Sequence, residues 1–301
     1  MDKNKIYCII VIYKHNRELF NIVIQSIIEQ VQKIIIVNNN KEVENFPLEN
    51  IETIQLNDNY GIAYAQNIGI KKAVSEGANF VLTSDQDTIY PDGYITTLLD
   101  IYNNYKHKHR IAAVAPVFFD RSLKNEAIMP VSIYTKEKII PRRNVDVLKD
   151  NVFFASHVIS SGMLIPVDSI INIGLMKENY FIDWVDTEWC FRANMFHYKI
   201  LQTSKIHVNH KHGERGKRIG KYILTEHTPI RRYYRVRNAI YMLLYEEIPF
   251  CFKKYVLISL LKMILMHFLQ ANDKKNEVIN KYFAIKDALC NKMGPIQHKL
   301  G

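Results

Sequence analysis

Cysteine is scarce in this sequence, and the few copies present fit neither disulfides nor a metal site. The four cysteines lie far apart, with no spacing typical of metal ligands: Cys8, Cys190, Cys251 and Cys290. Three of them fall inside apolar runs, so we expect buried free thiols in a reducing compartment. The first apolar run is short, and Lys14, His15 and Arg17 follow it at once. We therefore expect no signal peptide.

Long uncharged apolar stretches are also absent. The most apolar run, residues 250–270, is interrupted by Lys253, Lys254, Lys262 and His267. A membrane-spanning helix needs about 20 largely uncharged residues. We therefore expect an interfacial helix that lies on anionic lipid. A helix packed on the protein's own core and a true span are the alternatives.

Acidic residues are fewer than basic ones, 30 against 40, which gives a formal net charge of +10 and a pI near 9.2. This excess favours anionic partners such as a nucleotide diphosphate or acidic lipid, although a merely soluble basic surface would show it too. The sequence contains no helix-turn-helix, zinc-finger or RNP-like aromatic motif. We therefore expect no nucleic-acid partner.

The first half of the chain alternates apolar runs with helical patterns. Strands are predicted over residues 6–12, 33–37, 53–56 and 80–82. Helices are predicted from the stripe Leu19, Val23, Ile27 and Val31 and over residues 62–75. This order predicts an α/β fold with a Rossmann-like, mostly parallel sheet flanked by helices. Ligands of such sheets bind beyond the carboxyl ends of the strands.

The second half is more mixed. Strands are expected over residues 111–119, 162–166 and 199–202, and a helix over residues 186–196. Residues 120–151 are polar and irregular, which suggests a surface excursion. Thr228 and Pro229 are typical of the N-cap and first residue of a helix. We divide the 301 residues into a main domain, residues 1–227, and a C-terminal helical region, residues 228–301.

An acidic cluster, Ser84-Asp85-Gln86-Asp87, follows the predicted strand over residues 80–82. Two carboxylates one residue apart at a strand end can hold a divalent cation such as Mg²⁺ or Mn²⁺, which in turn can hold a diphosphate. Asp also favours turns, so a solvated turn is the alternative.

A second acidic cluster contains Asp183, Asp186 and Glu188 among aromatic residues. Aromatic surroundings would raise the pKa of a carboxyl, which suits a general base. Capping of the following helix is the alternative.

Basic residues gather in the glycine-containing loop 211–221 and at the start of the helix that follows Thr228. Arg231 and Arg235 could bind a diphosphate by bidentate contacts. The nearby His210 or His212 could complete a metal shell, or be structural. Residues 59–69 place small side chains at a helix entrance, where a ligand or a neighbouring strand can approach closely.

Taken in order, these segments resemble the inverting family 2 glycosyltransferases of GT-A fold. The resemblance covers roughly residues 5–245 and is carried by Val11-Ile12-Tyr13, Ile36-Val37-Asn38-Asn39, residues 59–69, Ser84-Asp85-Gln86-Asp87, Ser161-Gly162-Met163 and residues 181–192. The Ser-Asp-Gln-Asp form, residues 186–190 and residues 233–238 are similar to the bacterial rhamnosyltransferase branch.

The resemblance implies a site with three parts. The nucleotide sugar would be bound by Val11, Tyr13, Asn38, Asn39, Asn59, Gly61, Asn67, Asp85, Gln86, Arg231 and Arg235. The acceptor and sugar side would be formed by Ser161, Gly162, Asp183, Trp184 and Glu188. Asp87, with Asp85 and His210, would hold Mg²⁺ or Mn²⁺, and Asp186 would be the catalytic base.

We therefore expect a transferase that moves L-rhamnose from dTDP-L-rhamnose to a hydroxyl of a saccharide. A lipid-linked acceptor for surface polysaccharide, such as O-antigen or capsule, would place it in the cytoplasm, peripheral on the inner face of the plasma membrane. A transferase of the same fold that uses UDP-galactose or UDP-N-acetylglucosamine is one alternative. A non-catalytic nucleotide-sugar binding or scaffold protein is the other.

Overall fold

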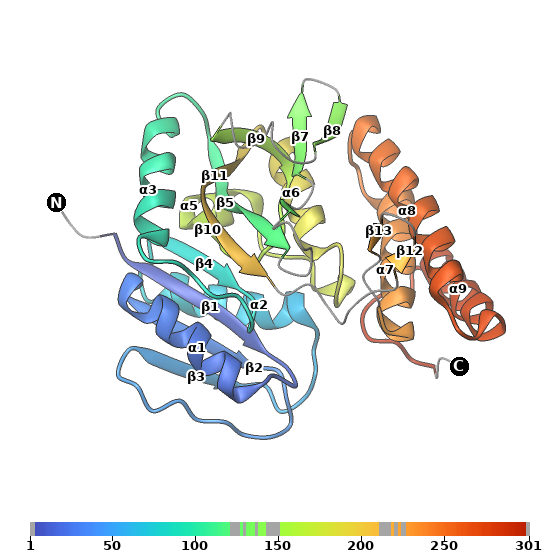
Figure 1. Cartoon of the computed structure of the whole chain (residues 1–301), viewed down its shortest axis with the longest axis horizontal. Coiled ribbons are helices and arrows are strands. Elements are labelled where there is room, and N and C mark those ends of the chain that lie inside the picture. The colour runs from blue at the N-terminus through green and yellow to red at the C-terminus, as the bar shows by residue number, and fades with distance from the viewer. Residues whose placement is uncertain are drawn as a thin grey trace.

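The computed structural model describes residues 4–120, 127–128, 131–135, 138–142, 151–210, 218–219, 222–223 and 227–298 (Figure 1). Within these residues one sheet runs through the molecule in the order β3-β2-β1-β4-β10-β5-β11-β9-β7-β8. Its strands are β1 Ile6–Ile12, β2 Lys33–Asn38, β3 Ile51–Gln55, β4 Phe80–Ser84, β5 Ile111–Asp120, β7 Val131–Thr135, β8 Lys138–Arg142, β9 Val152–His157, β10 Met163–Pro166 and β11 Lys199–His210. β6 (Ala127–Ile128) pairs with β5, and β12 (Arg218–Ile219) pairs with β13 (Tyr222–Ile223).

The sheet is parallel in the first half of the chain, where the alternation of strands and helices predicted it. The strands that follow β4 in the chain make the sheet mixed. β3, β2, β1 and β4 are parallel neighbours. β10 then pairs antiparallel with β4 and β5, and β9 pairs antiparallel with β11. The helices are α1 Arg17–Ile27, α2 Ile62–Ser75, α3 Tyr94–Tyr105, α5 Val167–Ile173, α6 Val185–Met195, α7 Pro229–Tyr245, α8 Phe250–Gln270 and α9 Lys274–Leu289.

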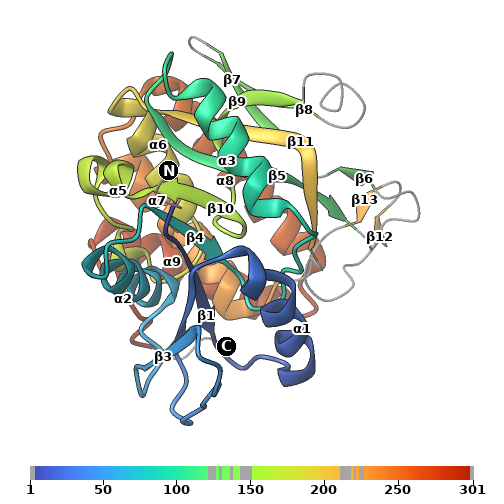
Figure 2. The same cartoon turned by 90° about the vertical axis from the view of Figure 1, so that its left-hand side faces the viewer.

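Successive side chains of β1 point into two different cores, because side chains alternate along a strand. Ile9 and Val11 pack with α2, α5 and α6, while Cys8 and Ile10 pack with α1 and α3. Figures 1 and 2 show these two sets of helices on opposite faces of the sheet. The strand ends between the two helical layers are therefore the place for a site.

Three expectations from the sequence are wrong in detail. The buried stripe of α1 is Phe20, Val23, Ile24 and Ile27, because the helix ends before Val31. The stretch 120–151 is not irregular throughout, since β7 pairs antiparallel with β9 and extends the sheet. Two of the four thiols are not buried: Cys251 is partly exposed and Cys290 is exposed.

The predicted helix start at Thr228 is present, and its side chain accepts the N–H of Arg231. α8 follows and packs one face on the core, where the Phe252 ring stacks on Phe191 with centroids 4.2 Å apart and planes 4° apart. The interfacial placement expected for residues 250–270 is thus wrong for this inner face. Within the described part of the chain, no helix is long and apolar enough to cross a membrane.

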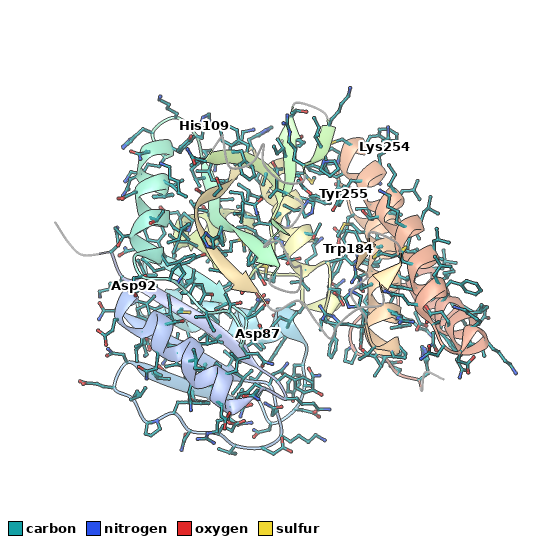
Figure 3. The ribbon with its side chains drawn as sticks, in the orientation of Figure 1. Asp87, Asp92, His109, Trp184, Lys254 and Tyr255 are labelled. Carbon is teal, nitrogen blue, oxygen red and sulfur yellow. The ribbon has the colours of Figure 1, made fainter. Side chains whose placement is uncertain are left out.

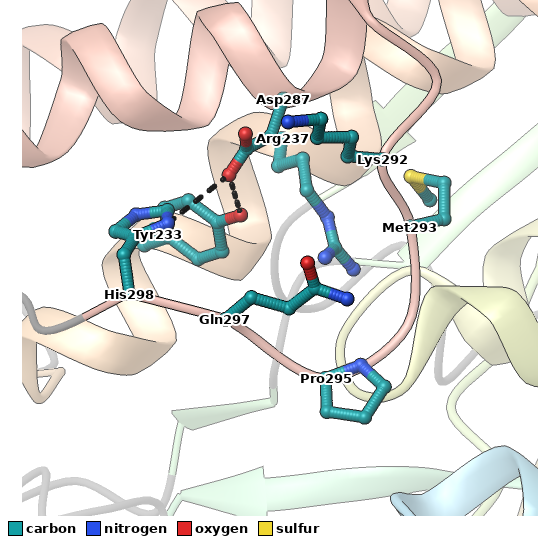
Figure 4. A pocket seen from close by; sticks show the side chains of 8 residues that line it. All are labelled: Tyr233, Arg237, Asp287, Lys292, Met293, Pro295, Gln297 and His298. Atoms are coloured by element: carbon teal, nitrogen blue, oxygen red, sulfur yellow. Dashed lines mark hydrogen bonds and ion pairs between the residues drawn. The ribbon is translucent and has the colours of Figure 1, made fainter.

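A cavity of about 250 Å³ lies between α7, the end of α9 and the segment that follows it (Figure 4). Tyr233 donates to Asp287 at 2.6 Å, and Arg237 donates to the carbonyl of Gly294 at 2.7 Å. None of the residues predicted for the site lines this cavity. These contacts hold the C-terminal segment against α7.

The stacking of Phe252 predicts that the C-terminal helices are part of the folded core. We expect Phe252→Ala to lower the free energy of unfolding by about 3–5 kcal/mol, because it removes a fully buried ring. Phe250→Ala is the matched control, since that ring is 81% exposed, and should change stability by less than about 0.5 kcal/mol. Chemical denaturation monitored by circular dichroism measures both. Equal stability of the two variants would contradict the packing described for α8.

Candidate active site

An amide side chain joins the carboxyl ends of β1 and β4. Tyr13, directly after β1, donates its N–H to Gln86 Oε1 at 2.8 Å, and its carbonyl accepts from Gln86 Nε2 at 3.2 Å. Asp85 and Asp87 flank this glutamine and are both partly buried. The first acidic cluster therefore lies at the sheet edge where the sequence placed it, as Figure 3 shows for Asp87.

The asparagine loops form a second link at the same edge. Asn39 donates from Nδ2 to Asn59 Oδ1 at 3.0 Å and accepts the N–H of Tyr60 at 2.9 Å. Asn59 Oδ1 also accepts the N–H of Gly61 at 3.0 Å. Two loops that are twenty residues apart in sequence are thus held together at the entrance of α2.

Gly61 allows this entrance to touch the second acidic cluster. Its φ is +85°, and a Cβ added there would lie 2.6 Å from both the ring and the carbonyl oxygen of Phe181. The next residue, Ile62, donates its N–H to that same carbonyl at 2.7 Å. A side chain at residue 61 would therefore push the 181–186 segment away from the sheet edge.

Ser161 and Gly162 lie beside the first acidic cluster. The N–H of Asp85 donates to Ser161 Oγ at 3.1 Å, and the Ser161 and Thr88 hydroxyls are 2.6 Å apart. Gly162 approaches so closely that a Cβ there would lie 2.5 Å from the Tyr94 hydroxyl. Of the predicted acceptor-side residues, Ser161 thus contacts Asp85 directly, and Gly162 follows it in the chain.

The segment that leads into α6 has an unusual backbone. Phe181, Asp183 and Trp184 have φ values of +65°, +62° and +66°. Non-glycine residues in this region cost roughly 1–3 kcal/mol each and persist only where surrounding contacts enforce them. Such strain is typical of functional sites.

α7 supplies those contacts. The buried amide of Asn238 donates from Nδ2 to the carbonyls of Tyr180, Ile182 and Asp183 at 2.9, 2.8 and 3.0 Å. Trp184 donates from its indole to the carbonyl of Arg235 at 3.0 Å. One face of α7 therefore binds the whole strained segment.

Arg231, one turn into α7, forms a bidentate ion pair with Asp183, with both N···O distances at 3.2 Å. The Asp183 charge, followed by smaller effects of Asp85 and Asp186, raises the pKa of this guanidinium against the opposing effect of burial. Arg235, one turn further on, contacts His227, and burial lowers the pKa of its guanidinium. The two predicted arginines thus lie on the side of α7 that faces the acidic residues.

Asp186 is the second residue of α6. Its Oδ1 accepts the N–H of Thr187 at 2.7 Å, and its Oδ2 accepts the N–H of Ser160 at 3.2 Å. Burial raises its pKa to about 6; the negative charges of Asp85 and Asp183 add to this, and the two backbone hydrogen bonds oppose it. A carboxylate with such a pKa is ionised at neutral pH and still basic enough to take a proton.

Four of the residues predicted for the site pack in the core or bind other side chains and carbonyls of the protein. Val11 is 6% exposed and lies in the core. The Asn38 amide contacts Gln55 and the loop after β2, and the Asn67 amide contacts Met176 and Glu178. Glu188 binds Arg192 and Lys177, because two residues along a helix turn it about 200° from Asp186.

Two neighbours of the site were not predicted from the sequence. Ser160 contributes a backbone N–H, and its position next to Ser161 is a signal for it in the sequence. Tyr255, on the inner face of α8, contacts His157 Nε2 at 3.0 Å. Burial raises the pKa of its hydroxyl, and the Asp186 charge adds to this. In the view of Figure 3, Trp184 lies between Asp87 and Tyr255. Tyr255 sits in an apolar run that gave no such signal.

The donor set at the first cluster fits an open metal site. Asp85 and Asp87 supply two carboxylates at one strand end, and the described residues offer no cluster of three or more His, Cys, Asp or Glu side chains for a closed cage. Mg²⁺ is commonly bound by one or two carboxylates together with water and substrate phosphates. The side chain of His210 and loop residues 211–217, including His212, lie outside the described residues.

The environment of Asp186 predicts a stability cost. Its folded pKa of about 6 lies above the ordinary value of 3.8, so the stability that this carboxyl contributes is fully present below about pH 4 and declines as the pH rises through 6. The loss at pH 8 is about 3 kcal/mol. We expect Asp186→Asn to melt a few degrees higher than the wild type at pH 8, with the gain gone at pH 4. Calorimetric melts at both pH values measure this.

The exposed Asp92 provides the control, since Asp92→Asn should give no pH-dependent gain. An Asp186→Asn protein that melts below the wild type at pH 8 would show that the carboxylate contacts outweigh the cost of its burial.

This geometry agrees with the proteins that the chain resembles. The family described as Glycosyl transferase family 2 matches residues 8–167, which is more than half of the 301 residues. The dTDP-rhamnosyl transferase RfbF of Shigella flexneri is 32% identical over 291 residues, which cover 94% of each chain.

Among solved structures, GalNAc-T7 with UDP, GalNAc and Mn²⁺ superposes with a TM-score of 0.59 at 12% identity, covering 96% of this chain and 56% of that one. The 1–349 part of TarS from S. aureus superposes with a TM-score of 0.57 at 14% identity, covering 94% and 80%. At these identities the structures establish the fold. Together with the family match and the Shigella flexneri relative, they lead to one conclusion: this chain belongs to the family 2 glycosyltransferases and has the GT-A fold.

Proposed function

We propose that the chain transfers L-rhamnose from dTDP-L-rhamnose to a hydroxyl of a saccharide, with inversion at the anomeric carbon. The observation that carries the reaction type is Asp186, a partly buried carboxylate with a pKa of about 6 near the charge of Asp85. The donor rests on the 32% identity to a dTDP-rhamnosyl transferase over 94% of both chains.

In the proposed mechanism Asp186 removes the proton of the acceptor hydroxyl. The acceptor oxygen then forms a bond to the anomeric carbon from the face opposite the leaving group. The bond between that carbon and the diphosphate oxygen breaks, and its electrons leave with the diphosphate. The N–H groups of Ser160 and Thr187 hold the two Asp186 oxygens in place throughout.

The donor diphosphate needs cationic support while it leaves. Asp87 and Asp85 would hold Mg²⁺ or Mn²⁺, which would stabilise the negative charge of the departing diphosphate. Arg235 lies near the charge of Asp183, and we propose that it donates to the diphosphate oxygens. Arg231 would act mainly by holding Asp183.

The base and ribose would lie over the ends of β1 and β2. The Tyr13 ring is 39% exposed beside Gln86, so it offers a flat apolar face. The linked amides of Asn39 and Asn59 offer polar groups nearby. These contacts would bind the nucleotide, while Asn38 and Asn67 would shape the loops that carry it.

The acceptor would approach from the side of Ser161, Gly162 and Trp184. We propose a lipid-linked saccharide for surface polysaccharide, handled at the inner face of the plasma membrane. A UDP-sugar donor remains the alternative of the same fold, which the UDP-GlcNAc complex of S. aureus TarS illustrates at 14% identity.

Isothermal calorimetry separates these donors. We expect dTDP-L-rhamnose to bind in the presence of Mg²⁺, and UDP-galactose and UDP-N-acetylglucosamine to bind at least about tenfold more weakly. EDTA or Asp87→Ala should weaken dTDP-rhamnose binding by about tenfold or more, because the diphosphate loses its cation. Asp92→Ala is the control for loss of a carboxylate on the same loop. Tight binding of a UDP-sugar alone would overturn the rhamnose donor and leave the reaction type in place.

Steady-state kinetics test the base. We expect Asp186→Asn to lower kcat by about 10²–10⁴-fold while donor affinity changes little. For the wild type, kcat/KM should fall below about pH 6 as Asp186 becomes protonated. Transfer by Asp186→Asn at the wild-type rate would rule out this residue as the base.

A further inference from the structure

The outward side of the two last helices is apolar, although nothing in the described structure covers it. Along α8, Leu257, Leu261, Leu265 and Phe268 are 47%, 60%, 58% and 44% exposed. Their spacing of four, four and three residues places them on one face of the helix. The opposite face, with Phe252, Val256 and Leu260, is buried in the core.

α9 repeats the pattern. Val278, Tyr282, Ile285 and Leu289 are 56%, 59%, 39% and 58% exposed, again at helical spacing. α8 and α9 contact each other and both pack on α7. Figure 1 shows them side by side at the edge of the molecule farthest from β3. We call these eight residues the outer face; an apolar area of this extent normally marks an interaction surface.

The charges around the outer face are nearly all positive. Lys254, Lys262, Lys275 and Lys286 are exposed on the same two helices. Of the acidic residues within 250–289, Glu277 and Asp287 are buried, and only Asp273, the N-cap of α9, is exposed. A second copy of this chain on the outer face would bring lysines against lysines without carboxylates to pair them. An anionic lipid surface complements both the apolar and the charged groups.

The geometry also fixes how such a helix would lie. Within the described residues, no helix can cross a membrane, and the inner face of α8 is occupied by the core. An amphipathic helix of this kind lies in the plane of the lipid headgroups, with its apolar face inserted and its lysines among the phosphates.

α8 connects this surface to the candidate base. Tyr255, on the inner side, contacts His157 and is close enough to Asp186 for that charge to act on it. One helix diameter, about 10 Å, separates the outer face of α8 from the side of the same helix that carries Tyr255. This step rests on the proposed function, because it implies that the acceptor is presented at the bilayer surface.

We propose that the outer face of α8 and α9 docks on an anionic bilayer and so presents the site to a membrane-tethered acceptor. Co-sedimentation of the full chain with phosphatidylcholine vesicles, with and without 30% phosphatidylglycerol, provides the test. The wild type should bind the anionic vesicles, bind the neutral ones at least about tenfold more weakly, and lose affinity as salt is raised.

The double variant Leu261→Glu with Leu265→Glu should bind anionic vesicles at least about tenfold more weakly. The matched control is Ile22→Glu with Ile171→Glu, which alters two residues that are equally exposed, at 53% and 67%, on α1 and α5. It should bind as the wild type does. Lys254→Ser with Lys262→Ser should weaken binding to anionic vesicles only.

Absence of wild-type binding to anionic vesicles, or equal loss in the control, would overturn the proposal. A wild type that is dimeric in size-exclusion chromatography and does not bind vesicles, with a monomeric Leu261→Glu/Leu265→Glu variant, would assign the outer face to a second copy instead. Donor binding by calorimetry is measured on the same proteins. Normal donor binding with no vesicle binding would reject the docking surface alone, whereas vesicle binding without donor binding would reject the proposed donor alone.

Discussion

The rest of the site depends on the hydrogen bonds between α7 and the strained segment before α6, residues 181–184. Three residues there, Phe181, Asp183 and Trp184, adopt left-handed backbone, which costs roughly 1–3 kcal/mol each. One buried amide, that of Asn238, binds three carbonyls of the segment, and Arg237 holds the amide by donating to its Oδ1 at 3.0 Å. Without α7 this segment would relax, and α6 would no longer begin where Asp186 meets Ser160. The C-terminal region therefore shapes the site rather than merely following it.

The burial of Asp186 lowers the stability of the fold and increases the basicity of the carboxylate. Its burial raises the pKa and weakens the fold at neutral pH, yet the same burial makes the carboxylate a stronger base than an exposed one. The two backbone N–H groups that donate to Asp186 reduce this loss of stability but do not cancel it. The sequence left helix capping open as the sole role of this residue, but the N-cap of α6 is Trp184 and the helix start has no side-chain capping bond. Asp186 lies in the first turn of α6, where a negative charge is favourable, and accepts the N–H of Thr187. The two roles are compatible, since each lone pair of a carboxylate can serve a different partner.

Sequence patterns predicted the helices and strands whose formation depends on residues close together in the chain. The apolar runs became β1, β2, β4 and α2 close to their expected bounds, because burial of alternating or periodic side chains needs no distant partner to be recognised. The loops at the sheet edge could be placed near one another from the predicted order of strands and helices alone. By contrast, Asn238 belongs to the segment 233–238 that carried the resemblance, but its role was not predicted from the sequence. That role depends on carbonyls more than fifty residues away, which α7 meets only in the folded chain. The contacts of Asn67 and Glu188 could not be predicted for the same reason. Their residue types suit a ligand, but their partners at Met176, Arg192 and Lys177 were invisible in the sequence.

The apolar run 250–270 shows how a single pattern can be compatible with two interpretations at once. A helix that is hydrophobic on every side needs an apolar environment on every side. Packing against the core and contact with lipid do not exclude each other, because α8 has one face for each. Phe252 and Val256 use the inner face, and that packing orients the outer face away from the protein. Because packing on the core fixes the rotation of α8 about its own axis, the fold determines which of its residues are exposed. The same rotation turns Tyr255 toward His157, so the packing of α8 sets both this inner contact and the surface that a membrane would meet.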